Sequence, residues 1–134
     1  MPLDSPSRFQ RILVIDDDSA LLQALATVLE GAGFQVFTAK SGREATGKIR
    51  EHPVELLITD LSMPDEDGIE IMRRLRKEHP QLKVIAMSGT FGPNMMSIAE
   101  KLGADATLSK PMTGTKLLEC IRRLSEGKPD HGGG

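Results

Sequence analysis

The sequence predicts an α/β domain built on a parallel sheet, because short apolar runs alternate with helical patterns from end to end. The runs Leu56–Ile58 and Val84–Met87 are apolar without alternation, as expected of strands that are covered on both faces. Five successive strand–helix units of this kind fold with right-handed crossovers, which place helices on both faces of the sheet. A chain of 134 residues is long enough for one such domain with its own core.

Five segments are predicted as strands because each is a short run rich in apolar or β-branched residues between turn signals. In chain order they are Ile12–Ile15, Gln35–Thr38, Leu56–Thr59, Val84–Met87 and Ala106–Leu108.

Five helices are predicted between and after these strands, from apolar residues at helical spacing and from end signals. The first carries a stripe from Leu22 to Leu29 and is closed by Gly31 and Gly33; the others are Ser41–Arg50, Ile69–Leu75 before Pro80, Asn94–Leu102 with Asn94 as N-cap, and Leu117–Leu124 before Gly127. The domain is expected over residues 10–126, with flexible tails at 1–9 and 127–134.

Composition excludes several classes of function. A net charge of -2 gives no basic footprint for nucleic acid, and a content of 3% aromatic residues disfavours base stacking. The single cysteine, Cys120, cannot form an internal disulfide, and its position on the apolar side of a predicted helix indicates packing. No apolar run is long enough for a membrane span and no signal peptide is evident, so the expected location is cytoplasmic.

Polar residues follow four of the five predicted strands, at the edge where parallel sheets of this kind bind ligands. Asp16 and Asp17 follow the first strand, Asp60 the third, Ser88 the fourth and Lys110 the fifth. If strands one and three are neighbours, the three carboxylates share one pocket.

Carboxylates this close are unfavourable unless a cation joins them, and ligands that are all oxygen suit Mg²⁺. A lysine and a hydroxyl at the same edge are partners for an anionic group rich in oxygen. The set therefore predicts a phosphoryl group beside Mg²⁺, with a carboxylate as the nucleophile that receives it.

Four motifs carry a resemblance to a known family: "ILVIDDD", "LLITDLSMPDEDG", "VIAMSGT" and "GADATLSKP". In this order and spacing, from about Arg11 to Leu124, they resemble the receiver domain of two-component response regulators. The resemblance is to stand-alone receivers of the chemotaxis-regulator kind. It implies a flavodoxin-like fold with a five-stranded parallel sheet in the order 2-1-3-4-5 and five helices on both faces.

The resemblance implies that Asp60 is the phosphoacceptor. It implies that Asp17 and Asp60 are direct ligands of Mg²⁺, that Asp16 acts largely through water, and that the backbone carbonyl of Ser62 completes the protein ligands.

The resemblance also makes Ser88 the hydroxyl switch residue and Lys110 the lysine that contacts the phosphoryl group, with a cis bond to Pro111. Thr107 departs from the family, which has an aromatic residue at this position. A threonine cannot fill an aromatic pocket or vacate it. Activation is therefore expected to use either a smaller rearrangement around Ser88 and residues 91–96 or a partner that reads the site directly.

The function implied is a single-domain response regulator that accepts a phosphoryl group from a histidine kinase or histidine phosphotransfer protein. It would not be an enzyme, although it would assist its own phosphorylation and dephosphorylation. Because the chain ends soon after the last helix, output is expected through protein contacts rather than through nucleic acid or a membrane. The face around residues 94–102, 106–108 and 113–125 is the expected target site.

Two alternatives remain open. In a phosphatase of the haloacid-dehalogenase type, Asp16 would be the nucleophile and Asp18 the general acid and base, but this leaves Asp60 unexplained. In a receiver-like binding module that is never phosphorylated, Thr107 would be the supporting feature.

For Asp18 the expected role is at the start of the first helix, with Ser19 as the alternative cap.

Overall fold

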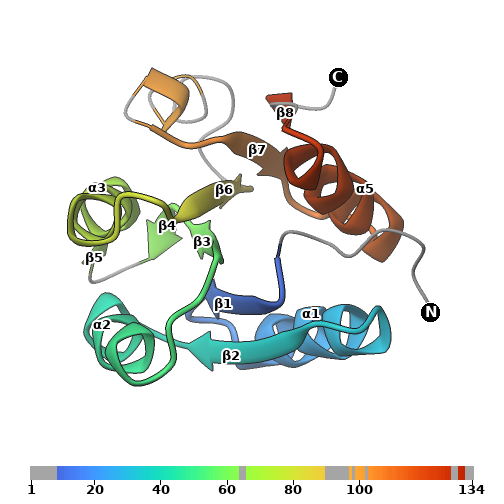
Figure 1. Cartoon of the computed structure of the whole chain (residues 1–134), viewed down its shortest axis with the longest axis horizontal. Coiled ribbons are helices and arrows are strands. Elements are labelled where there is room, and N and C mark those ends of the chain that lie inside the picture. The colour runs from blue at the N-terminus through green and yellow to red at the C-terminus, as the bar shows by residue number, and fades with distance from the viewer. Residues whose placement is uncertain are drawn as a thin grey trace.

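The structure is a computed structural model, and it describes residues 9–63, 66–89, 97, 99–101, 103–127 and 130–131. Its centre is a parallel sheet in the order β2-β1-β3-β6-β7-β8 (Figure 1). The strands are β1 (Arg11–Ile15), β2 (Gln35–Ala39), β3 (Leu56–Asp60), β6 (Lys83–Ser88), β7 (Ala106–Ser109) and β8 (Asp130–His131). The first five confirm the predicted strands to within one residue at each end, and their order confirms the order 2-1-3-4-5.

Helices cover both faces of the sheet, as predicted. They are α1 (Ser19–Gly31), α2 (Gly42–Glu51), α3 (Gly68–Glu78) and α5 (Gly114–Ser125). Helices α1 and α5 lie on one face, and α2 and α3 lie on the other (Figure 1). Of the helix expected over Asn94–Leu102, residues 97 and 99–101 are helical, and the remaining positions, Asn94 included, lie outside the described residues.

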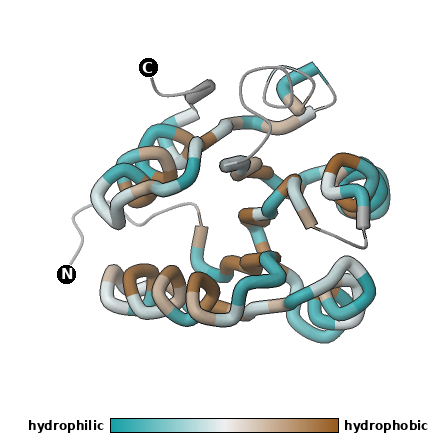
Figure 2. Tube along the Cα trace, turned by 180° about the vertical axis from the view of Figure 1, so that it is seen from behind, coloured by the Kyte–Doolittle hydropathy of each residue, from teal (hydrophilic) through white to brown (hydrophobic). Residues whose placement is uncertain are grey.

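Two apolar layers explain why the strands are apolar without alternation. In β1, Ile12 and Val14 pack in the layer under α1 and α5, whereas Leu13 and Ile15 pack in the layer under α2 and α3. All four are 0% exposed, because successive side chains of a strand point to opposite faces and both faces are covered. The hydrophobic residues accordingly gather along the strands and on the inner sides of the helices (Figure 2).

The segment after β3 forms a small antiparallel pair that the sequence did not predict. Strand β4 (Ser62–Met63) pairs with β5 (Glu66–Asp67). Asp67 then caps α3 by accepting from the backbone N–H of Ile69 at 3.0 Å and of Glu70 at 3.3 Å. Neither the cap nor the pair was predicted, because two-residue strands have no recognisable period.

The two expected tails each contain an ordered position. Phe9 is 3% exposed and belongs to the layer under α1 and α5, so the packed chain begins at least one residue before the predicted start. Within the expected C-terminal tail, β8 pairs in parallel with β7 at the edge of the sheet. Among the described residues, no helix combines the length and the apolar character needed to cross a membrane.

Helix α1 is capped at both ends by local chemistry. Asp18 Oδ1 accepts from the N–H groups of Ala20 at 3.0 Å and Leu21 at 3.2 Å. At the other end, the N–H of Phe34 donates to the carbonyl of Leu29, and Gly33 has a φ of 101°. This is a Schellman ending, for which glycine is favoured because the left-handed conformation strains other residues.

We expect Asp18→Ala to lower the free energy of unfolding by about 1 kcal/mol, because two N–H groups of the first turn lose their acceptor. Asp18→Asn should lose only a few tenths of that, since an amide oxygen also caps helices well. Urea unfolding of the two variants beside the parent measures both. Equal losses in the two variants would show that the charge of Asp18, and not its capping oxygen, stabilises α1.

Candidate functional site

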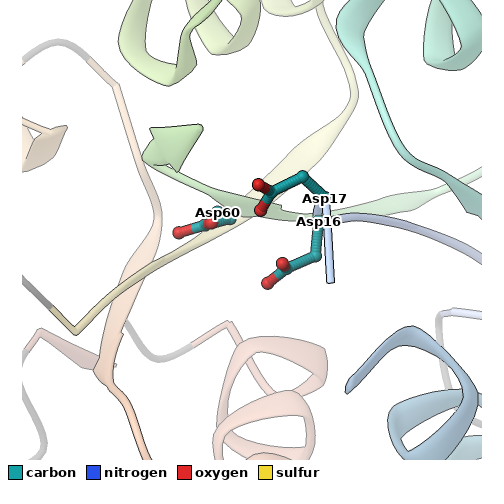
Figure 3. Close-up of side chains that lie close together, drawn as sticks. All are labelled: Asp16, Asp17 and Asp60. Atoms are coloured by element: carbon teal, nitrogen blue, oxygen red, sulfur yellow. The ribbon is translucent and has the colours of Figure 1, made fainter. Parts of the chain in front are cut away.

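Three carboxylates meet at the carboxyl edge of the sheet, where β1 and β3 end side by side. The register pairs Ile15 with Thr59, so Asp16 and Asp60 are the next residues on two neighbouring strands. One oxygen from each of Asp16, Asp17 and Asp60 lies within 4.8 Å of the others. Figure 3 shows these side chains gathered at the ends of their strands. The structure therefore brings together the three carboxylates that the sequence predicted as a set.

Two of these carboxylates are buried, and burial changes the pKa of one of them, Asp60. Asp16 and Asp60 are each 1% exposed, whereas Asp17 is exposed. Burial raises the pKa of the Asp60 carboxyl above its usual value, and the nearby charge of Asp16 raises it further. A hydrogen bond from the N–H of Ser62 (3.1 Å to Oδ1) and the charge of Lys110 oppose the rise. The pocket thus favours an added positive charge beside Asp60.

Lys110 supplies one positive charge to the pocket. Its Nζ donates to Asp16 Oδ2 at 2.7 Å and lies 3.3 Å from Asp60 Oδ2. Burial lowers the pKa of Lys110, but the hydrogen bond to Asp16 and the two carboxylate charges outweigh burial and raise the pKa above its usual value. The Lys110–Pro111 bond is cis, as the resemblance predicted.

The backbone also ties the site together across β6 and β7. The N–H of Lys110 donates to the carbonyl of Ser88 at 3.0 Å, and the N–H of Leu61 donates to the carbonyl of Met87 at 2.9 Å. These hydrogen bonds therefore hold the carboxyl ends of β3, β6 and β7 side by side at the same edge of the sheet.

Three buried hydroxyl oxygens at and near this edge have no hydrogen-bond partner in the described part of the chain: those of Ser62, Ser88 and Thr107. Ser88, at the end of β6, was predicted as a site residue. The Ser62 hydroxyl was not predicted, since only its carbonyl was considered. An unpaired buried hydroxyl is costly, so these oxygens are available to an added polar group.

Thr107 is 0% exposed and pairs with Ala86 of β6, which is consistent with a small side chain at this position. Residues 91–96, for which a rearrangement was expected, lie outside the described residues.

Two glycines pack closely against residues of the site, a role that the sequence did not predict for them. A Cβ on Gly68 would lie 2.5 Å from Leu61 Cα and 2.6 Å from the Asp60 carbonyl oxygen, so α3 begins directly against the turn after β3. A Cβ on Gly89 would lie 3.0 Å from Lys110 Cβ. The available signals were a glycine directly before a helical stripe and a glycine directly after Ser88.

Asp18 takes no part in the carboxylate set. Its side chain accepts from the first turn of α1, and its N–H donates to Asp16 Oδ1 at 2.9 Å. The preferred role at the helix start is therefore confirmed, with Asp18 and not Ser19 as the cap. This placement leaves the phosphatase alternative without its second catalytic carboxylate.

Comparison with known proteins gives one consistent family. Residues 12–122 match the response regulator receiver domain. The chain is 34% identical over 116 residues to the response regulator receiver protein CpdR of Brucella abortus, which covers 86% of this chain and 96% of that protein. It is 29% identical over 118 residues to the chemotaxis protein CheY of Thermotoga maritima, which covers 87% of this chain and 98% of that protein.

Longer relatives match over part of their length. The chain is 34% identical over 113 residues to the response regulator GtcR of Aneurinibacillus migulanus, and the match spans 84% of this chain but only 45% of that protein. Among solved structures, a response regulator receiver domain protein from Clostridium thermocellum superposes with a TM-score of 0.81 at 34% identity. That superposition covers 88% of this chain and 95% of the other. The chain belongs to the receiver domains of two-component response regulators, which act in signal transduction as phosphoacceptors rather than as enzymes.

Proposed function

We propose that this chain accepts a phosphoryl group on Asp60 in a reaction that depends on Mg²⁺, and that it signals through contacts with other proteins. The observation that carries the proposal is the arrangement of Asp16, Asp17 and Asp60 within 4.8 Å, with Lys110 Nζ 3.3 Å from Asp60 Oδ2. Membership of the receiver family supports the same role.

The chemistry assigned to each side chain follows from its position. An oxygen of Asp60 attacks the phosphorus of a phosphohistidine, the P–N bond breaks, and the imidazole leaves with the electron pair, so Asp60 becomes an acyl phosphate. Lys110 and the unpartnered hydroxyl of Ser88 are placed to bind the phosphoryl oxygens, on which negative charge accumulates. Attack by water on the same phosphorus releases phosphate and restores the carboxylate. The side chains of this domain assist both the transfer to Asp60 and the later hydrolysis. The domain is itself the substrate of both steps.

The carboxylates fit a hard divalent cation. The donor set is all oxygen, two members are buried, and burial and Asp16 raise the pKa of Asp60, which an adjacent cation would lower. Both oxygens of Asp16 already accept hydrogen bonds, from Asp18 N–H and from Lys110 Nζ, which supports a role through water. Asp17, Asp60 and the Ser62 carbonyl would then be the direct ligands of Mg²⁺. When bound, the ion would offset the negative charge of the phosphoryl group.

The test is a mass measurement on the intact protein. With Mg²⁺ and acetyl phosphate, we expect one added phosphoryl group (about 80 Da, the mass of one phosphoryl unit), and none in Asp60→Ala. Asp18→Asn is the matched control, because it changes an adjacent carboxylate outside the pocket and should keep the adduct. An adduct that persists in Asp60→Ala, or no adduct on the parent chain, would contradict the proposal.

Two further measurements address the alternatives. Multiple turnover on a phosphate ester that is lost in Asp16→Asn and kept in Asp60→Asn would support the phosphatase. Calorimetric titration without Mg²⁺ binding, together with no adduct, would support the binding module that is never phosphorylated.

Receiver domains interact with histidine kinases or phosphotransfer proteins and with downstream targets, and we propose both kinds of partner for this chain. The proposed output face comprises residues 94–102, strand β7 and helix α5. Its described part includes a shallow hollow on α5 lined by Thr115, Leu118, Glu119 and Arg122. There Arg122 pairs with Glu119 at 2.7 Å and with Glu126 at 2.6 Å, which orders a charged rim around the half-buried Leu118. We propose a cytoplasmic location, which the family supports.

A further inference from the structure

The outer edge of β7 is covered by the C-terminal segment of the same chain. Strand β8 pairs in parallel with β7, matching Asp130 with Ala106 and His131 with Thr107. Figure 1 shows β8 beside β7 and near the end of α5. Without β8, β7 would be the last strand of the sheet on this side.

The geometry of β7 shows which backbone groups this cover meets. Asp105 N–H donates inward to the carbonyl of Val84 at 2.8 Å. Because successive backbone N–H groups of a strand point to opposite sides, those of Ala106 and Leu108 point to the outer edge and that of Thr107 points to β6. Residues 106–108 are at most 5% exposed in the intact chain. If nothing covered this edge, its two outward backbone amides would be unpaired.

Such an edge is a template for pairing with another chain, and proteins commonly blunt it. At the opposite side of the sheet, the edge strand β2 is blunted by a lysine, since Lys48 Nζ donates to the carbonyl of Thr38 at 3.0 Å. Among the described residues of β7, no lysine or proline interrupts the strand itself. Protection of this edge therefore falls to the C-terminal segment.

We propose that residues 130–131 are a built-in edge strand that covers β7 and prevents it from pairing with β7 of a second copy of this chain. Pairing of β8 with β7 costs little entropy, because only four residues separate α5 from β8 and the local concentration of β8 at this edge is high. Since β7 lies in the proposed output face, a partner that adds a strand there must first displace β8. This last consequence rests on the proposed function, whereas the cover itself does not.

The test compares two truncations of the chain. One ends at Gly127 and lacks β8, and the matched control ends at His131 and lacks only the last three glycines. By NMR-detected hydrogen exchange, we expect the amides of Ala106 and Leu108 to exchange at least about tenfold faster in the shorter chain. The amide of Thr107 and all amides of the control should be unchanged. Equal exchange of Ala106 and Leu108 in the two truncations would overturn the proposal.

Sedimentation equilibrium tests the consequence. The chain that ends at Gly127 should self-associate more strongly than the control, and faster exchange without stronger association would overturn the protective role.

Full-length His131→Pro, which lacks the N–H at the position paired with Thr107, provides a second variant and should show the same faster exchange. Both truncations should still form the acetyl-phosphate adduct, because neither removes a residue of the pocket formed by the three carboxylates and Lys110. Loss of the adduct in the parent chain would count against the proposed function and leave the exchange result standing.

Discussion

Gly68→Ala should lower the free energy of unfolding by about 3 kcal/mol, at the upper end of the usual cost of overpacking. The added Cβ would lie 2.5 Å from Leu61 Cα, 2.6 Å from the Asp60 carbonyl oxygen and 2.9 Å from the Leu61 carbonyl carbon. These are backbone atoms of the strand end that carries the proposed phosphoacceptor. They cannot rotate away as a side chain can, so either α3 or the turn after β3 must move.

Urea unfolding measures this loss, and Gly47→Ala is the matched control. A Cβ on Gly47 meets no atom within 4 Å, and Gly47 lies inside α2. That substitution should raise the free energy of unfolding by about 0.5–1 kcal/mol through the better helix propensity of alanine. A Gly68→Ala chain as stable as the parent would show that α3 can shift without cost and that this contact does not position Asp60.

Lys110→Ala should lower the free energy of unfolding by about 2 kcal/mol at neutral pH without divalent cations, because two buried carboxylates lose their shared cation. Lys110 Nζ lies 2.7 Å from Asp16 Oδ2 and 3.3 Å from Asp60 Oδ2. The same variant should accept the phosphoryl group from acetyl phosphate far more slowly, because a donor to the phosphoryl oxygens is lost.

The pH dependence of this loss follows from Asp60. Burial and the charge of Asp16 raise the pKa of Asp60, while Lys110 opposes the rise, so removal of Lys110 raises that pKa further. A carboxyl whose pKa is higher in the folded than in the unfolded state destabilises the fold above that pKa, and protonation removes the effect. The deficit of Lys110→Ala should therefore be smaller at a mildly acidic pH than at neutral pH.

Urea unfolding in a chelating buffer at the two pH values checks this expectation. Lys116→Ala, which removes an exposed lysine of α5, is the control and should stay within about 0.5 kcal/mol of the parent at both. A deficit that is constant or grows as the pH falls would mean that the aliphatic packing of Lys110, and not its charge, stabilises the site.

The sequence was sufficient for those features that depend on local pattern. Strands such as β3 were predicted because both faces of the sheet are covered, which makes the run from Leu56 to Ile58 continuously apolar. The site residues were predicted because the residue after a strand stands at the ligand-binding edge of a parallel sheet. The order of the strands was not local information. It came from the family resemblance, because the periodicity of a strand does not specify its neighbours.

Tertiary structure alone decided the contacts between distant segments. Lys110 reaches Asp16 across 94 positions of sequence, Gly68 packs against the backbone of Asp60 and Leu61, and β8 pairs with the outer edge of β7. Each of these contacts depends on where two distant segments meet in space. A local sequence pattern does not specify which distant segment it will contact. The sequence by itself therefore determined the α/β class, the core and the chemistry available at the strand ends. How closely these groups approach, which oxygens remain unpaired and which edge is covered were decided by packing.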